Sequence, residues 1–330
     1  MIYTDLLIVG AGPIGIACGL EAKKNDLNYI IIEKGSVANS ILHYPAGMTF
    51  FSTAEKIEID NIPLVTSNSK PSRDEYAEYL IKIVDKNKLN IKLFEKIIDI
   101  KKDENGRLIF TSNKNTYSTK YGILAIGFFD FPNLLEIEYK YSDKIKHYFD
   151  DARAYAFCKT AVIGGGNSAT QAALELNRFK SQTTIIVRKN DFDDSVKYWI
   201  KPDIQNRIKD GEIKAYFNSK IISVEKNFIV INDGIKDIVI ENDFVFALIG
   251  YRPDFDLLRK AGIYVSEKGE IFYNGANYET NVSNLYLAGV VCGGSDTNKW
   301  FIENSLIHAK IILNDINKKE NKKKQINRHI

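Results

Sequence analysis

Short apolar runs recur along the chain, and two of them end in glycine-rich turns that are followed by a helical pattern. The first run leads into the turn at 10–15, and the second leads into the turn at 164–169. A further strand pattern follows each helix, at 29–32 and 184–187. Apolar strands that alternate with helices are typical of parallel sheets with helices on both faces. The pattern predicts an α/β protein with two Rossmann-like units.

The remaining pattern predicts several more elements. Ser72 and Glu75 form a capping box, which predicts a helix that runs through Tyr76 to Lys86. An Asn105-Gly106 turn signal joins two strand patterns. The segment 40–53 is expected to be a loop. Other strands are expected at 91–94, 97–101, 108–111, 121–126, 244–249 and 284–291 and near 214, 221 and 228, and other helices at 168–178 and 301–316.

Both glycine turns have the spacing of a dinucleotide-binding turn. The first glycine permits the tight turn, the second lets the backbone approach a pyrophosphate, and the third position packs the helix on the strand. A diphosphate then lies at the helix N-terminus, where free N–H groups and a partial positive charge favour an anion. Because each match is preceded by a strand pattern and followed by a helix pattern, we predict two nucleotide sites.

The residue at the end of the following strand differs between the two units. Glu33 ends the first, and Arg188 and Lys189 end the second. A carboxylate at this position accepts both ribose hydroxyls, whereas a guanidinium suits a 2′-phosphate. We therefore expect FAD or NAD at the first site and NADPH at the second.

Composition narrows the class of protein. The 330 residues, 45% of them hydrophobic, are enough for two domains of ordinary size. A formal charge of +3, from 45 basic and 42 acidic residues, favours neither nucleic acid nor a membrane surface as a partner. The beginning of the chain shows no leader pattern, so a cytoplasmic location is expected. The basic run at 318–324 is expected to be a solvated terminal tail.

The three cysteines are Cys18, Cys158 and Cys292. They are scattered, no two form a Cys-x-x-Cys pair, and no His or Cys cluster has metal-ligand spacing, so we expect neither a disulfide framework nor a metal site. Cys18, between two glycines of the first helix, is expected to be a packed residue.

Taken in order, these motifs resemble the low-molecular-weight thioredoxin reductase-like flavoproteins. The resemblance implies two Rossmann-like (three-layer ββα) dinucleotide-binding domains, with an NADPH domain (128–250) inserted in an FAD domain (1–127 and 251–330). It also implies a homodimer and two domains that rotate so that NADPH reaches the flavin. The expected FAD-binding residues are Gly10, Gly12, Pro13, Ile14, Gly15, Glu33, Lys34, Phe51, Ser52, Thr53, Ala125, Gly127, Gly289 and Val290. The expected NADPH-binding residues are Gly164, Gly166, Asn167, Ser168, Ala169, Arg188 and Lys189.

Within that group, the segments 43–55, 57–63, 250–254 and 301–304 are similar to those of the YpdA family of bacillithiol disulfide reductases. The resemblance implies electron transfer from NADPH through FAD to an oxidised thiol. Two residues depart from the usual pattern. Ile14 stands where bacillithiol-linked members often have a cysteine, and Val290 stands where an acid commonly contacts the ribityl chain.

Hydride transfer from nicotinamide to flavin needs orientation rather than a catalytic dyad. For the oxidative half, Cys292 is a candidate thiol if a helix N-terminus lowers its pKa, and a packed small residue otherwise. His43 is a candidate proton donor to a leaving thiolate, or a residue that orders its loop. Trp300 is a candidate for stacking on the flavin or substrate, or for a dimer contact.

Three functions follow as hypotheses. The first is an NADPH-dependent flavin reductase acting on a low-molecular-weight disulfide or on a small redox protein that carries it. The second is a ferredoxin or flavodoxin NADP reductase, which needs no dithiol. The third is a flavin-containing sensor that binds nucleotides without turnover.

Overall fold

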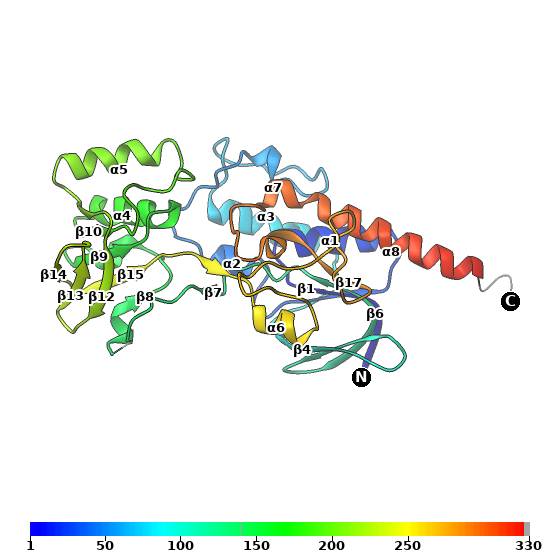
Figure 1. Ribbon diagram of the computed structural model, residues 1–330. Helices are drawn as coiled ribbons and strands as arrows, with labels where there is room; N and C mark the ends of the chain where they lie inside the picture. Colours follow the sequence, from blue (N-terminus) through cyan, green and yellow to red (C-terminus); the bar gives the residue numbers. More distant parts are fainter. Residues whose placement is uncertain (139, 327–330) are drawn as a thin grey trace. The chain divides into compact units, whose positions relative to one another are not determined.

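A computed structural model describes residues 1–138 and 140–326 (Figure 1). The chain divides into two compact units. Unit 1 contains Met1–His43, Gly47–Phe131 and the chain from Tyr251 onward, and unit 2 contains Tyr44–Ala46 and Pro132–Gly250. Two short strands, β7 (Phe131–Pro132) and β16 (Tyr251–Arg252), pair with each other where the chain passes between the units. Unit 2 is therefore an insertion in unit 1.

Unit 1 is built on a sheet with the order β3-β2-β1-β6-β5-β4, and β17 also pairs with β6. Strands β3, β2, β1, β6 and β17 are parallel, whereas β4, β5 and β6 are antiparallel. The strands are β1 (Ile2–Val9), β2 (Tyr29–Ile32), β3 (Ile91–Lys92), β4 (Ile97–Lys102), β5 (Leu108–Ser112), β6 (Thr116–Leu124) and β17 (Leu285–Leu287). The central strand β1 is buried from Leu6 to Val9, as its apolar run predicts.

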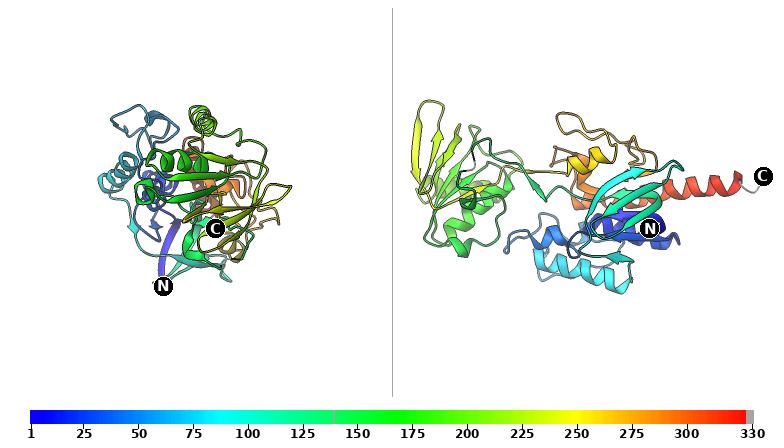
Figure 2. Two further views of the ribbon diagram at one scale, coloured as in Figure 1. Left: turned by 90° about the vertical axis from the view of Figure 1, so that its left-hand side faces the viewer. Right: turned by 90° about the horizontal axis from the view of Figure 1, so that it is seen from below.

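The helices of unit 1 pack on this sheet or on one another. Helix α1 contacts β1 and β2 and lies beside α8, which is the long C-terminal helix in Figures 1 and 2. The helices are α1 (Pro13–Lys24), α2 (Asn39–Leu42), α3 (Arg73–Lys86), α6 (Phe255–Lys260), α7 (Ile302–Ser305) and α8 (Ile307–Ile326), with the 3₁₀ turns η1 (Ala54–Lys56) and η4 (Gly289–Gly293). None of the helices in the described part of the chain has the length and hydropathy needed to cross a membrane.

Unit 2 repeats the plan with a parallel sheet in the order β11-β10-β9-β15-β8 and a separate antiparallel sheet β12-β13-β14. The parallel strands are β8 (Ile145–Lys146), β9 (Lys159–Ile163), β10 (Gln182–Ile186), β11 (Lys214–Tyr216) and β15 (Phe244–Ala247). The others are β12 (Lys220–Val224), β13 (Phe228–Asn232) and β14 (Asp237–Glu241). The helices are α4 (Asn167–Arg178) and α5 (Ile200–Lys209), with the 3₁₀ turns η2 (Ser142–Lys144) and η3 (Ala152–Tyr155).

The capping box is confirmed in the structure. The backbone N–H of Glu75 donates to the Ser72 hydroxyl, and the N–H of Ser72 donates to the Glu75 carboxylate. Tyr76, Leu80 and Ile83 on the helix that follows are buried. The local sequence was sufficient here because both capping bonds join Ser72 and Glu75, which are three residues apart.

The structure differs from the expected elements at several points. The segment 40–53 is not wholly a loop, because α2 extends into its beginning as far as Leu42. The strand β8, which precedes β9 and forms the edge of the unit 2 sheet, was not among the expected strands. Phe149, which follows β8, packs edge-to-face on Phe246 in the core. A two-residue edge strand has too little apolar alternation to be recognised locally.

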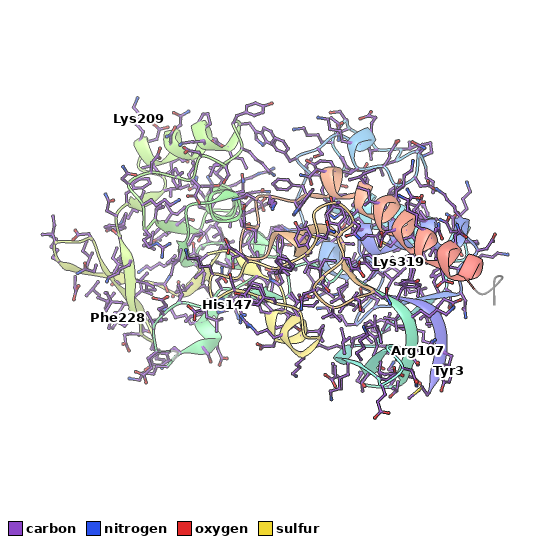
Figure 3. All side chains as sticks on the ribbon, turned by 45° about the vertical axis from the view of Figure 1, so that its right-hand side comes forward. Tyr3, Arg107, His147, Lys209, Phe228 and Lys319 are labelled. Atoms are coloured by element: carbon purple, nitrogen blue, oxygen red, sulfur yellow. The ribbon has the colours of Figure 1, made fainter. Side chains whose placement is uncertain are left out.

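The third difference concerns the basic run expected to be a solvated tail. Through residue 326 this run belongs to α8, and Lys319 (labelled in Figure 3) pairs with Glu279 at 2.7 Å and with Asp315 at 3.2 Å. Its ammonium also donates to the Tyr286 hydroxyl, which donates in turn to Asp315. These contacts attach α8 to the strand β17, which precedes the Gly289 turn.

Candidate functional site

The first glycine turn lies between β1 and α1 in unit 1. The Gly10 N–H donates to the Ile32 carbonyl at 2.8 Å, so the turn is joined to the neighbouring strand. Gly10 has φ +108°, and a Cβ there would lie 2.5 Å from the Ala125 carbonyl oxygen. Only glycine fits this position, because both the dihedral angle and the neighbouring backbone exclude a side chain.

Gly12 and Gly15 have different surroundings. A Cβ on Gly15 would lie 1.9 Å from the Gly10 carbonyl oxygen, so this glycine allows the helix to pack on the turn. A Cβ on Gly12 would meet nothing within 4 Å. Gly12 is the N-cap of α1, and no side chain caps that helix. The start of α1 therefore combines N–H groups that no side chain caps with open space beside Gly12, an arrangement suited to a diphosphate.

Glu33 is buried at the end of β2, with 6% of its surface exposed. One carboxylate oxygen accepts from the Ala11 N–H at 2.7 Å, and the other accepts from the Gly35 N–H at 2.9 Å. Burial raises the pKa of Glu33, and the two N–H groups oppose that shift. Each oxygen has a further lone pair, so the carboxylate is also available to ribose hydroxyls.

The turn after β17 closes the same region of unit 1. Gly289 has φ +85°, and a Cβ there would lie 3.1 Å from Cγ1 of Ile14 on α1. The Gly289 N–H donates to Nδ1 of His308 at 3.1 Å. The structure therefore brings together Ile14 and Gly289, both expected at the FAD site, but it uses the Gly289 N–H internally. Val290 is partly exposed and is the second residue of η4.

His308 is a residue of this region that the sequence did not indicate. It is fully buried, its ring stacks on Tyr278 with centroids 3.9 Å apart, and Trp300 packs edge-on against it at 4.4 Å. Burial lowers the pKa of His308 to about 4. No motif surrounds this histidine in the sequence, so only the packing of α8 against η4 identified it.

Cys292 lies in the same cluster. Its Sγ atom is 3.9 Å from Nδ1 of His308, and only 3% of the residue is exposed. Burial raises the pKa of the Cys292 thiol. A thiolate is therefore disfavoured here, and these surroundings support the interpretation of Cys292 as a packed residue. Cys18 is likewise fully buried.

The other residues expected near the flavin differ in their exposure. His43 is exposed, and its Nδ1 donates to the Asn39 carbonyl at 2.7 Å, which orders the end of α2. Phe51 is 52% exposed, whereas Ser52 is buried and Thr53 caps η1. Of the remaining expected FAD residues, Lys34 forms an ion pair with Asp130, Pro13 is the first residue of α1, and Ala125 and Gly127 follow β6.

The second glycine turn reproduces the geometry of the first within unit 2. The Gly164 N–H donates to the Ile186 carbonyl at 3.0 Å, and a Cβ on Gly164 would lie 2.4 Å from the Leu248 carbonyl oxygen. Gly166 is the N-cap of α4, which no side chain caps, and Ala169 is fully buried against the turn. Two separate turns thus meet the same requirement for an anion site at a helix N-terminus.

The polar residues around the second turn have different environments. Arg188 is exposed at the end of β10, and no ion pair involves its guanidinium in the described part of the chain. Lys189, in contrast, forms an ion pair with Asp193, a residue that no sequence motif indicated. Ser168 is exposed on the first turn of α4. The side chain of Asn167 is engaged with the segment 195–197, so its backbone rather than its amide remains for a ligand.

The comparisons with known proteins agree with this architecture. Residues 7–289 match the family model described as pyridine nucleotide-disulphide oxidoreductase, and the chain belongs to this family of oxidoreductase enzymes. It is 36% identical to the bacilliredoxin reductase Bdr of Bacillus subtilis (strain 168), over 97% of this chain and 100% of that protein.

Two solved structures are similar over almost the whole chain. The bacillithiol disulfide reductase Bdr (YpdA) from Staphylococcus aureus has a TM-score of 0.93 and 35% identity, covering 97% of this chain and 99% of that one. The corresponding protein from Bacillus cereus has a TM-score of 0.93 and 32% identity, covering 95% and 98%. The predicted resemblance to the YpdA family and the predicted fold class are confirmed. The relatives support a flavin disulfide reductase over the two alternative functions.

Proposed function

We propose that this protein is an NADPH-dependent, FAD-containing reductase that passes electrons to a disulfide of the bacillithiol type or to a bacilliredoxin-like protein. The observation that carries the proposal is the pair of matching glycine turns with opposite charges beside them. Glu33 is buried and hydrogen-bonded beside the first turn, and Arg188 is exposed and without an ion pair beside the second, among the described residues. The first suits the adenosine ribose of FAD and the second suits the 2′-phosphate of NADPH.

The residues of unit 1 fit FAD. The uncapped N-terminus of α1 and the open space beside Gly12 would hold the diphosphate, and Glu33 would hold the ribose. When bound, FAD supplies the chemistry of accepting a hydride from the nicotinamide and delivering two electrons to a disulfide. The balanced reaction is NADPH, a proton and a disulfide giving NADP⁺ and two thiols.

The chain's own contribution to this reaction is binding and positioning. Ile14 packs against Gly289, so the helix of the first turn and the η4 turn form one wall of the FAD site. His43 is exposed and would be able to exchange protons with solvent and substrate, and we retain it as the candidate proton donor. Cys292 is assigned no covalent role, because its thiol is buried and protonated.

The acceptor is inferred from two observations. Two similar proteins carry the names bacilliredoxin reductase and bacillithiol disulfide reductase. All three cysteines are free, and none forms a pair that would act as a protein dithiol. The disulfide would therefore be reduced without a dithiol relay in this chain. The resemblance also implies a cytoplasmic homodimer, which sedimentation of the purified protein tests.

A direct test begins with the purified protein. It is expected to be yellow, to be bleached by NADPH without oxygen, and to oxidise NADPH continuously when bacillithiol disulfide or an oxidised bacilliredoxin is added. Continuous NADPH oxidation with ferredoxin, and none with either disulfide, would instead support a ferredoxin reductase. The lack of a dithiol is also compatible with that function. Failure to bind FAD after reconstitution would contradict the proposal.

A further inference from the structure

The segment that follows β10 lies directly on the second glycine turn. The Asp193 N–H donates to the Gly165 carbonyl at 2.9 Å. The Asn167 side chain donates to the Ser195 carbonyl at 2.7 Å and accepts from the Lys197 N–H at 2.9 Å. Residues 193–197, which we call the strap, are thus attached to both the turn and the first residue of α4.

The strap places an acidic side chain at an anion-binding turn. An Asp193 carboxylate oxygen lies 3.5 Å from the position that a Cβ of Gly166 would occupy. Gly166 is the N-cap of α4, beside the N–H groups that would receive a diphosphate. A carboxylate is favourable there without a ligand, but it repels the phosphates when a dinucleotide binds.

Lys189 is placed to remove that repulsion. Its ammonium forms an ion pair with Asp193, whereas Arg188 forms none among the described residues. Arg188 and Lys189, the two adjacent cations after β10, therefore differ in what they are able to bind. Only Arg188 is unengaged and able to contact a 2′-phosphate without giving up an existing ionic partner.

Building on the proposed NADPH site, we propose that Lys189 serves the dinucleotide indirectly by neutralising Asp193 beside the diphosphate, and that Arg188 alone reads the 2′-phosphate. Lys189 is then a positioning residue for the diphosphate, which NADPH and NADH share. The effect of its removal must be equal for the two dinucleotides and must depend on the presence of Asp193. If Lys189 contacted the 2′-phosphate together with Arg188, its removal would weaken the binding of NADPH and leave the binding of NADH unchanged.

The test measures the dissociation constants of NADP⁺ and NAD⁺ by calorimetry, and the KM values of NADPH and NADH for flavin-linked turnover. Lys189→Ala is expected to weaken the binding of both dinucleotides by about threefold, which is the effect of losing one solvent-exposed charge interaction. Asp193→Asn is expected to leave both unchanged or tighter. The double variant Lys189→Ala/Asp193→Asn is expected to bind both as tightly as the unaltered protein.

Two controls separate this role from general electrostatics and from folding. Arg188→Ala should weaken NADP⁺ by about tenfold or more and leave NAD⁺ unchanged, since it removes a charge-assisted phosphate contact. Asp191, which pairs with Lys201 at 3.0 Å, is an acidic residue two positions before Asp193. Asp191→Asn should not restore dinucleotide binding to Lys189→Ala, because Asp191 does not lie within 4 Å of the position that a Cβ of Gly166 would occupy.

Fragments of the dinucleotide sharpen the result. Binding of ADP, which has the diphosphate, should fall in Lys189→Ala, and binding of adenosine 2′-phosphate should fall in Arg188→Ala. Selective loss of NADP⁺ in Lys189→Ala, or no rescue by Asp193→Asn, would overturn the inference while leaving the proposed function intact. An unaltered protein that binds neither NADP⁺ nor NAD⁺ would end both.

Discussion

The Gly289 N–H donates to Nδ1 of His308, which places a buried imidazole directly behind the turn proposed to face the flavin. Since Nδ1 is the acceptor, the ring is neutral and its proton is on Nε2. Nε2 has no hydrogen-bond partner among the described residues, and the ring is held by stacking on Tyr278. The η4 turn is thereby tied to α8 by an interaction that protonation of Nδ1 would break.

This bond predicts a specific loss of stability in mild acid. The pKa of His308 is about 4 in the folded chain, below its ordinary value of 6.5, because burial disfavours the charged ring. A lowered pKa means that the unfolded chain binds the proton first as pH falls. The contribution of neutral His308 to the free energy of unfolding should therefore be fully present above pH 6.5. That free energy should decrease by about 2–3 kcal/mol between pH 6.5 and 4. Urea unfolding across this range measures it.

The matched variant is His308→Asn, whose side-chain oxygen accepts a hydrogen bond but does not titrate there. Its stability should be lower at neutral pH, since the stacking on Tyr278 is lost, and its decline between pH 6.5 and 4 should be shallower. An identical pH slope in both proteins would show that other groups dominate. Flavin absorbance of the variant reports separately whether the η4 turn has moved.

The glycines of the first turn should respond differently to the same change. Gly12→Ala is expected to fold with nearly unaltered stability, because its Cβ meets nothing within 4 Å, but to lose FAD, because the methyl group occupies the space of the diphosphate. Gly15→Ala is expected to be poorly folded, since its Cβ would lie 1.9 Å from a carbonyl oxygen. Thermal unfolding of the apoproteins and the flavin content after reconstitution distinguish the two. Equal stability of both variants would contradict the assigned roles.

Glu33→Ala should both reduce flavin retention and destabilise the apoprotein. The substitution leaves the N–H groups of Ala11 and Gly35 without acceptors, at a cost of about 1–3 kcal/mol each if they stay buried. Glu95 provides a control, because it is also buried but its carboxylate accepts hydrogen bonds from Ser112 and Tyr117 rather than from the glycine turn. Its backbone N–H donates to the Glu33 carbonyl, and the substitution keeps that bond. Glu95→Ala should destabilise the fold without changing the FAD content of folded protein. Full FAD occupancy in Glu33→Ala would refute the ribose contact.

Cys292→Ser should leave NADPH-driven disulfide turnover close to that of the unaltered protein. The thiol is buried and its pKa is raised, so no thiolate is available to attack a substrate disulfide. Turnover is measured with bacillithiol disulfide, and flavin reduction by NADPH alone is the internal control. Abolished turnover with intact flavin reduction would restore Cys292 as a catalytic thiol.

Much of the fold could be predicted because its signals are local. The glycine turns, the strands leading into them and the capping box of α3 each depend on residues within one turn or one strand–helix junction. The elements that were missed, such as β8, are short and take their structure from a distant partner strand. A two-residue strand is specified by pairing with β15 rather than by its own sequence.

By itself, the sequence determined the two nucleotide-binding turns, the acid beside one and the base beside the other, and the lack of a paired dithiol. These depend on backbone geometry and side-chain chemistry that neighbouring residues specify. Only the tertiary structure decided that His308 accepts from Gly289, that Cys292 is buried beside it, and that Lys189 forms an ion pair with Asp193. These contacts arise when separate elements pack together, so burial and charge at each residue are set by partners that no local pattern specifies.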